Sequence, residues 1–244
     1  MTNFWKVVNS VIHDADVILL VIDARLVEQT RNSEIEANVK RTGKPLIYVL
    51  TKCDLVNKDE AEKWKRILKP CVFISSKDYS GMKLLRERIF IESKNYKDKI
   101  KVGVLGYPNV GKSSLINALK GKSSAVVSSN SGQTRGVMRV RSRGIVFLDT
   151  PGVLPYMEKD AIKQAITGTI DFNKAKDPDL VVIEIMEQYP GKIESFYDIE
   201  EKEDKEKTIK DIAIKCNYLA KGGKPDILRV ARKILQDWQT GKIK

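Results

Sequence analysis

The chain has 244 residues, 42% of them hydrophobic, which is enough for one substantial core and a smaller second one. Its longest apolar runs, such as VILLVI at 17–22, fall short of the roughly 20 residues that cross a bilayer. The amino end also lacks the pattern of a secretory signal, so we expect a cytoplasmic protein with no membrane partner. The formal net charge of +12 favours an anionic partner, and its excess is concentrated at 101–154, with 8 basic and 1 acidic residues.

Up to about residue 150, short runs rich in Val, Ile and Leu alternate with amphipathic stretches, which is typical of an α/β fold with a largely parallel sheet. The pattern predicts strands at 16–23, 46–51, 71–75, 101–106, 136–142 and 145–149, and helices near 3–13, 31–42, 58–68, 81–93 and 112–120. SRG between the last two strands predicts an antiparallel hairpin at the edge of the sheet. Helical spacing then takes over, so we predict an α/β domain over 1–155 and a smaller all-α domain over 156–244. In the second, the charged run 199–207 should be exposed.

The first motif along the chain is TKCD, residues 51–54, and its chemistry suits guanine. Asp54 can accept hydrogen bonds from the ring N–H and the exocyclic amine, a charge-assisted pair that adenine cannot match. Lys52 would lay its stem over the purine face. Thr51 stands where such motifs usually have Asn, so we expect a poorer strut to the phosphate-binding loop. The next strand leads into a loop that resembles those whose backbone N–H groups contact guanine O6: Ser75, Ser76 and Lys77.

The second motif, GYPNVGKS at 106–113, fits G-x-x-x-x-G-K-[ST] and lies between a predicted strand and a predicted helix. Its glycines, Gly106 and Gly111, let backbone N–H groups surround the β-phosphate at a helix amino terminus. Lys112 would reach the β- and γ-phosphates, and the hydroxyl of Ser113 would hold Mg²⁺. We expect the same pocket to include Asn109, Val110, Gly111 and Ser114.

The third motif, DTPG at 149–152, closes the strand GIVFL about forty residues after the phosphate loop begins. Asp149 could orient Mg²⁺ through water, and the N–H of Gly152 could meet the γ-phosphate. Between the two motifs, Thr134 in GQTRG is the predicted second hydroxyl on Mg²⁺, able to bind only while the γ-phosphate is present. The predicted catalytic groups are therefore Lys112, Thr134 and Gly152.

Together these three motifs, with SSK at 75–77 and GQTRG at 132–136, resemble the five motifs of the translation-factor-related GTPases. Their order is similar to that of the circularly permuted GTPases of the YlqF/YawG type. In ordinary members the phosphate motifs precede TKCD and SSK, whereas here they follow them. The resemblance runs from DADVILLVIDAR at 14–25 through DTPG and resumes weakly at 222–243. It implies a P-loop GTPase fold, GTP or GDP with Mg²⁺ as ligands, and a role in ribosome large-subunit assembly.

The position after DTPG, where many small GTPases place a water-orienting glutamine, is occupied by Val153 and followed by Leu154. Neither side chain can hold water, so we expect slow intrinsic hydrolysis. The resemblance implies that a partner or a potassium ion completes the site. Asn109 is the candidate ligand for K⁺. The equal alternative is that Asn109 is an ordinary polar loop residue with no role in binding the ion.

Two sets of basic residues could meet RNA phosphates. Arg139, Arg141 and Arg143 alternate along one predicted strand, either as an RNA contact or as a solvated edge that resists aggregation. In the last helix the apolar residues share one side, namely Ile227, Leu228, Ala231, Ile234, Leu235 and Trp238. The other side carries the basic residues Arg229, Arg232 and Lys233, which the resemblance favours as an RNA surface; no DNA partner is expected.

The sequence thus favours a GTP-hydrolysing switch that docks on ribosomal RNA or a large-subunit precursor and leaves after hydrolysis. A first alternative keeps the GTPase but gives the helical domain a protein partner and no RNA role. A second is a P-loop ATPase or nucleotide kinase, against which TKCD argues.

Overall fold

The computed structural model describes residues 3–93, 99–120, 126–127, 137–150, 152 and 160–243. The chain divides into two compact units, Met1–Glu158 and Lys159–Lys244, and each is described by itself. The predicted division at residue 155 falls outside the described residues, so that boundary stays a prediction. None of the described helices combines the length and the apolar character that a bilayer crossing needs.

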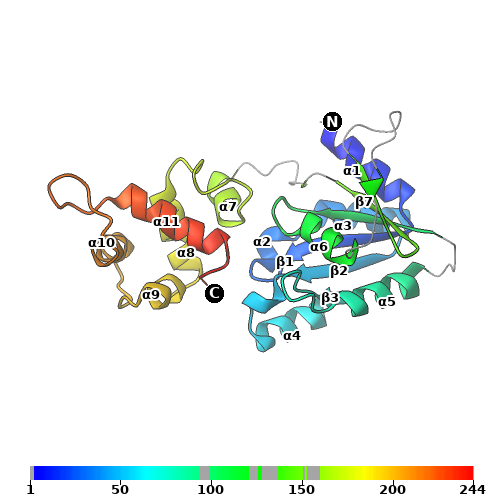
Figure 1. The fold of residues 1–244 in the computed structure, drawn as a ribbon, viewed down its shortest axis with the longest axis horizontal. Coiled ribbons are helices and arrows are strands. Elements are labelled where there is room, and N and C mark those ends of the chain that lie inside the picture. The colour runs from blue at the N-terminus through cyan, green and yellow to red at the C-terminus, as the bar shows by residue number, and fades with distance from the viewer. Residues whose placement is uncertain are drawn as a thin grey trace. The chain divides into compact units, whose positions relative to one another are not determined.

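Unit 1 is built on a seven-stranded mixed sheet with the order β3-β2-β1-β4-β7-β6-β5. Figure 1 shows the sheet with helices packed around it. The five strands from β3 to β7 in this order are parallel, while β6 and β5 are antiparallel to their neighbours. The predicted α/β fold class is confirmed. The strands are β1 (Val17–Asp23), β2 (Leu46–Thr51), β3 (Cys71–Phe73), β4 (Ile100–Gly106), β5 (Val126–Val127), β6 (Met138–Ser142) and β7 (Ile145–Asp149).

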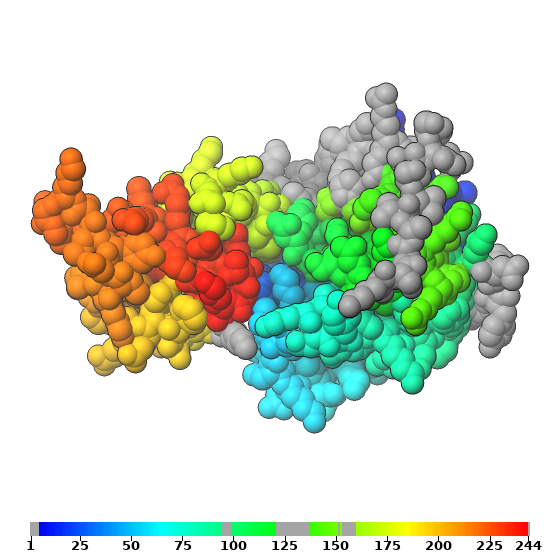
Figure 2. All heavy atoms as spheres, in the orientation of Figure 1, coloured from blue at the N-terminus to red at the C-terminus, as the bar shows by residue number. Residues whose placement is uncertain are grey.

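The helices of unit 1 cover both faces of this sheet, as expected when parallel strands are joined by helical crossovers. One core cluster joins the sheet to α5 and α6, and the other joins it to α1 and α3. On the face drawn in Figure 2, α5 and α6 cover the sheet. The helices are α1 (Asn3–Asp14), α2 (Val27–Thr30), α3 (Ser33–Thr42), α4 (Lys58–Ile67), α5 (Met82–Ser93) and α6 (Lys112–Lys120), with the 3-10 turn η1 at Cys53–Leu55.

The predicted hairpin joins β6 to β7 through Arg143 and Gly144, whose φ angles of 42° and 81° are those of a two-residue turn with both central residues left-handed. Its predicted place at the edge is wrong, because β5 pairs with β6 on the outside. Arg143 belongs to the turn and not to the strand, so the predicted alternation holds only for Arg139 and Arg141.

Unit 2 consists of helices packed around one apolar core. Three of them begin at an aspartate, Asp160, Asp204 or Asp226, whose side chain accepts a hydrogen bond from a backbone N–H three residues ahead. The aromatic ring of Trp238 fills the core, as predicted, and its Nε1 donates to the carbonyl of Ile166 at 3.1 Å. The helices are α7 (Ala161–Ile166), α8 (Pro178–Gln188), α9 (Lys192–Tyr197), α10 (Lys205–Lys215) and α11 (Ile227–Gln239).

Candidate nucleotide-binding site

Five parallel strands of unit 1 end along one edge of the sheet. Because β3, β2, β1, β4 and β7 are neighbours in this order and run in the same direction, their carboxyl ends lie side by side. SSK follows β3, TKCD follows β2, the phosphate loop follows β4 and DTPG follows β7. The sheet therefore brings four distant segments to the edge where open α/β sheets bind ligands.

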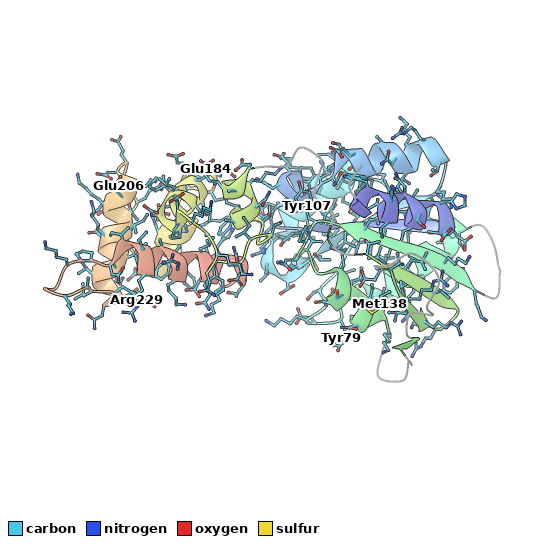
Figure 3. All side chains as sticks on the ribbon, turned by 90° about the horizontal axis from the view of Figure 1, so that it is seen from above. Tyr79, Tyr107, Met138, Glu184, Glu206 and Arg229 are labelled. Atoms are coloured by element: carbon cyan, nitrogen blue, oxygen red, sulfur yellow. The ribbon has the colours of Figure 1, made fainter. Side chains whose placement is uncertain are left out.

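The phosphate loop is folded around Lys112, whose side chain is 7% exposed. The ammonium of Lys112 donates to the carbonyls of Gly106 at 3.1 Å and Tyr107 at 2.6 Å. Tyr107 is buried and anchors the loop to the core (Figure 3). A Cβ on Gly106 would lie 2.3 Å from the carbonyl oxygen of Val21, so only glycine lets the loop leave β4 at this point.

Burial lowers the pKa of Lys112 to about 8, although the neighbouring Asp149 carboxylate favours the charged ammonium. In the folded chain this lysine therefore releases its proton at a lower pH than in the unfolded chain. Between about pH 8 and the ordinary value of 10.5 the unfolded state binds more protons, so the free energy of unfolding rises with pH across this window.

Nucleotide affinity is expected to have the opposite pH dependence, because phosphate binding needs the charged ammonium. With a pKa of about 8 for Lys112, the affinity for GDP should fall about fivefold between pH 8 and pH 9. Fluorescence titration with mant-GDP from pH 7 to pH 9 measures this. The Lys112→Arg variant keeps its charge over this range, so whatever affinity it retains should not vary with pH. A wild-type affinity that is constant to pH 9 would contradict the prediction.

The carboxylate of Asp149 is buried, and within the described part of the chain its Oδ1 has no hydrogen-bond partner. Burial raises the pKa of Asp149, while the charge of Lys112 and hydrogen bonds from the Thr150 backbone and the Ser113 side chain act in the opposite direction. An unpaired carboxylate oxygen beside a hydroxyl suits a hard cation that prefers oxygen ligands. Ser113 and Asp149 therefore fit the predicted Mg²⁺.

Gly152 of DTPG packs directly on the phosphate loop. A Cβ at this position would lie 2.4 Å from the Cα and 2.5 Å from the backbone nitrogen of Pro108. No side-chain rotation relieves a contact with backbone atoms. Glycine is therefore required for the two phosphate motifs to lie this close together.

Replacing Gly152 by alanine is expected to weaken GTP binding about tenfold and GDP binding less than twofold. The added methyl group must push the DTPG turn away from Pro108, which removes one charge-assisted hydrogen bond to the γ-phosphate. Competition of GTP and of GDP against mant-GDP measures the two affinities. An equal loss for both nucleotides would show that the substitution damages the loop as a whole.

The base-reading motif is fastened to the phosphate loop by Thr51. Its hydroxyl lies 2.5 Å from the carbonyl of Val110 and 3.1 Å from that of Ile22, and because it carries a single proton the shorter contact is the stronger hydrogen bond. Thr51 thus makes a strut to the phosphate loop, and the expectation that this strut is poorer than one made by Asn stays a prediction. The backbone N–H of Cys53 also donates to the carbonyl of Ile74 at 3.2 Å, which ties TKCD to the end of β3.

Asp54 lies in η1 with an exposed side chain, and Lys52 before it has a left-handed backbone with φ 57°. In the following loop Ser75 is buried, bridges to Ser80 and accepts a hydrogen bond from the N–H of Asp78 at 3.2 Å. The predicted strand 71–75 ends at Phe73 because this bridge turns the chain. Ser76 is half-buried and Lys77 exposed.

The remaining predicted pocket residues lie in two groups. Val110 and Asn109 lie in the phosphate loop, and Ser114 lies in the first turn of α6. Val110 is buried, while Asn109 and Ser114 are exposed, and Asn109 has a left-handed backbone with φ 58°. Thr134, Val153 and Leu154 lie outside the described residues.

Sequence reasoning missed two charged residues at this edge, Asp23 and Arg25. Asp23 ends β1, between the base motif and the phosphate loop, and is 1% exposed. It pairs with Arg25 at 2.8 Å and with Lys52 at 2.7 Å. The sequence signal for these residues is DAR at 23–25, a polar stretch that ends the apolar run VILLVI. Nothing in the sequence shows that Asp23 pairs with Lys52 of TKCD.

The two predicted basic surfaces lie on β6 and on α11, and the apolar side of α11 differs from the prediction. Arg139 and Arg141 are exposed on one face of β6. On α11, Leu228 is 51% exposed and not part of the apolar side, because it lies at the margin of the arc formed by the buried residues Val230, Ala231, Ile234, Leu235 and Trp238.

The basic side of α11 is partly neutralised. The ammonium of Lys233 lies 2.6 Å from both oxygens of Asp237, a buried carboxylate that also accepts a hydrogen bond from Tyr197 at 2.8 Å. Arg232 is half-buried. Arg229, labelled in Figure 3, is exposed. Its guanidinium lies 5.3 Å from the centre of the Tyr218 ring. Lys233 thus serves an internal ion pair.

A mixed sheet with the base motif on β2 and the phosphate loop on the later β4 defines a P-loop GTPase domain whose motifs are circularly permuted. The chain belongs to the RsgA GTPase family, whose model matches residues 6–156. A second family model, described as 50S ribosome-binding GTPase, matches residues 101–218.

Curated relatives share most of this chain. An uncharacterised GTP-binding protein of Methanocaldococcus jannaschii is 43% identical over 98% of the chain and 65% of its own length. Nucleolar GTP-binding protein 2 of Neurospora crassa is 35% identical over 98% of the chain and 40% of its length, and its Saccharomyces cerevisiae counterpart is 32% identical over 98% and 52%. The chain thus spans between 40% and 65% of the length of these relatives.

Solved structures show the same fold. GNP-bound YlqF from T. maritima aligns with a TM-score of 0.65 and 25% identity, covering 93% of this chain and 89% of that one. A GDP-bound YlqF structure aligns with a TM-score of 0.67 and 24% identity, covering 94% and 92%. The resemblance to circularly permuted GTPases of the YlqF type is confirmed.

Proposed function

We propose that this chain is a GTP-binding and GTP-hydrolysing switch that acts in assembly of the large ribosomal subunit. The observation that carries the proposal is the meeting of SSK, TKCD, the phosphate loop and DTPG at one edge of a parallel sheet. Support for the ribosomal part comes from the matching model described as 50S ribosome-binding GTPase and from relatives named nucleolar GTP-binding proteins.

In this proposal the residues of the phosphate loop neutralise and orient the nucleotide. Lys112 offers its ammonium to the β- and γ-phosphates, and Gly152 offers a backbone N–H to the γ-phosphate. Ser113, Asp149 and Thr134 supply oxygen ligands for Mg²⁺, which when bound offsets negative charge on the phosphates. Asn109 remains the proposed K⁺ ligand.

Base selection is assigned to the loops after β2 and β3. Asp54, on the exposed turn η1, would accept two hydrogen bonds from guanine, while the stem of Lys52 would contact the purine face. Backbone N–H groups of Ser75, Ser76 and Lys77 would meet the guanine carbonyl oxygen. An ATP-selective enzyme would need neither Asp54 nor this geometry, and competition of ATP and GTP against mant-GDP tests that alternative.

For the partner we propose ribosomal RNA or a large-subunit precursor, contacted through Arg139 and Arg141 and through Arg229 and Arg232 in unit 2. Arg139, Arg141 and Arg229 are exposed, and Arg232 is half-buried. Basic side chains at the surface suit a phosphate backbone, and binding through them should weaken steeply with salt. The protein-partner alternative is favoured by exposed apolar side chains of unit 2, among them Phe196, Ile214 and Leu228. Cytoplasmic localisation remains a prediction.

Co-sedimentation with isolated large ribosomal subunits tests the proposal. The chain is mixed with subunits in the presence of GDP, of a non-hydrolysable GTP analogue or of no nucleotide, at salt from about 50 to about 200 mM. We expect most association with the analogue, a steep loss with salt, and faster GTP hydrolysis when subunits are present.

Paired charge reversals identify the surface. Arg139→Glu with Arg141→Glu should reduce co-sedimentation, whereas Lys40→Glu with Lys69→Glu, at exposed lysines of unit 1 outside the proposed surface, should not. Nucleotide-independent association, or none, would contradict the ribosomal role while leaving the GTPase assignment intact. Salt-insensitive association would favour a contact through apolar side chains.

A further inference from the structure

Asp23 occupies the centre of the candidate site's edge, where β1 ends between β2 and β4. Its carboxylate is almost fully buried and receives four N–H contacts. Oδ1 accepts from the backbone N–H of Arg25 at 3.0 Å and from its Nε at 3.1 Å. Oδ2 accepts from Nη2 of Arg25 at 2.8 Å and from Nζ of Lys52 at 2.7 Å.

The loop that carries Arg25 is closed on itself. The backbone N–H of Asp23 donates to the hydroxyl of Thr30 at 3.1 Å, and that hydroxyl donates to the carbonyl of Leu26 at 2.7 Å. The Arg25 side chain is 10% exposed. Arg25 and Asp23 therefore form a preset unit, to which Lys52 is joined from the loop after β2, 29 residues away in sequence.

Lys52 lies between the two residues of TKCD that have the most direct roles in the candidate site, Thr51 and Asp54. Thr51 before it is bonded to the phosphate loop, and Asp54 after it lies in the short turn η1. The left-handed φ of 57° at Lys52 is uncommon for a side chain of this kind. Such a conformation persists where surrounding contacts impose it. Here these contacts include the ion pair with Asp23 and the hydrogen bond from the Leu55 N–H to the Lys52 carbonyl at 3.0 Å.

We propose that Asp23, held by Arg25, is a positioning residue for guanine recognition, because it fixes the Lys52 ammonium and with it the stem and loop that meet the base. This inference rests on the proposed GTP-binding function. Asp23 does not itself touch the nucleotide, since both of its oxygens are engaged by Arg25 and Lys52.

A role in stability alone explains this cluster less well. Buried ion pairs contribute little net stability, since desolvation offsets their attraction. Here one carboxylate holds two cations, one of which comes from the loop that is proposed to read the base. A link of this kind between two loops of the candidate site suits a positioning role.

The test is a double-mutant cycle of Asp23→Asn and Lys52→Met, measured by mant-GDP titration and thermal unfolding. Asp23→Asn alone should weaken GDP binding about tenfold, the loss of one charge-assisted contact, mainly through faster dissociation. In the Lys52→Met background the same substitution should change affinity less than twofold, because the group it acts through is gone. A structural role would give equal losses in both backgrounds.

Two further variants keep the test decisive. Glu36→Gln breaks the bidentate pair of Arg31 and Glu36, with contacts of 2.6 and 2.8 Å on the same unit, and should leave GDP affinity unchanged. If Asp23→Asn does not fold, Arg25→Met, which frees the carboxylate of Asp23 without removing it, should weaken GDP binding in the same direction. If the wild type binds no GDP, the proposed function is wrong. If the wild type binds GDP and both Asp23→Asn and Arg25→Met bind it with unchanged affinity, only this inference is wrong.

Discussion

Replacing Lys112 by alanine is expected to lower GDP and GTP affinity about a thousandfold and to abolish measurable hydrolysis. The ammonium lies inside the phosphate loop, where it donates to the carbonyls of Gly106 and Tyr107, and these donors would turn to the phosphate oxygens when the nucleotide binds. Charge-assisted hydrogen bonds to phosphate contribute about 1.5–3 kcal/mol each, and two such bonds account for the loss. Calorimetric titration with GDP and a phosphate-release assay measure the two effects.

The control for this substitution is Lys101→Ala, which removes an exposed lysine at the other end of β4. It should change neither affinity nor hydrolysis. Truncating Lys112 also removes the hydrogen bonds to two carbonyls and the positive charge beside Asp149. Thermal unfolding of both variants therefore shows whether the fold is intact. GDP binding within tenfold of wild type in Lys112→Ala would mean that the phosphates do not lie in this loop.

The convergence of the motifs could be predicted from sequence because it depends only on strand direction and neighbourhood. A parallel sheet places the loops after β2, β4 and β7 on one edge whatever the order in which the chain visits the strands. Cutting and rejoining the chain elsewhere leaves these neighbours in place. The motif order therefore changed without changing the site, and the local signals of TKCD and GYPNVGKS were sufficient to find it.

The contacts that hold the site together could not be predicted, because they depend on register between strands. Thr51 lies opposite Asp23 in the pairing of β1 with β2, and this register brings Lys52 to the carboxylate. A shift of one residue would turn these side chains to the other face of the sheet. No spacing in the sequence specifies that register, so the contact of Thr51 with Val110 and the Asp23 cluster became visible only in the structure.

Unit 2 shows the limit of helical periodicity. The pattern of α11 correctly placed Trp238 and Ile234 in the core, but it also placed Leu228 there and treated Lys233 as part of a basic surface. Helical periodicity predicts which side of the helix a side chain faces. It does not predict how much of that side is covered by the rest of the protein. It also cannot show that Asp237, on the same helix, is buried beneath Lys233 and bonded to Tyr197.

Asp54→Asn is expected to exchange guanine for xanthine as the preferred base. Guanine presents two donors, the ring N–H and the exocyclic amine, which the two oxygens of a carboxylate can accept together. An asparagine amide supplies one acceptor and one donor, so its NH₂ would face the amine of guanine. The variant keeps one neutral acceptor for the ring N–H, but it loses the carboxylate charge and sets a donor against the donor of the amine. Losses of about 1.5–3 kcal/mol at each of the two contacts predict a fall in GDP affinity of about a thousandfold.

Xanthine carries a carbonyl oxygen in place of that amine, so it presents one donor and one acceptor to the amide of the variant. Asp54→Asn should therefore bind XDP more tightly than GDP, and the wild type should show the reverse order. Competition of both nucleotides against a fluorescent diphosphate measures the two ratios, with Asp59→Asn, an exposed aspartate in the first turn of α4, as the matched control. If Asp54→Asn keeps the wild-type preference for GDP, the loop after β2 does not read the base, because only a contact elsewhere could then distinguish a donor from an acceptor at that ring position.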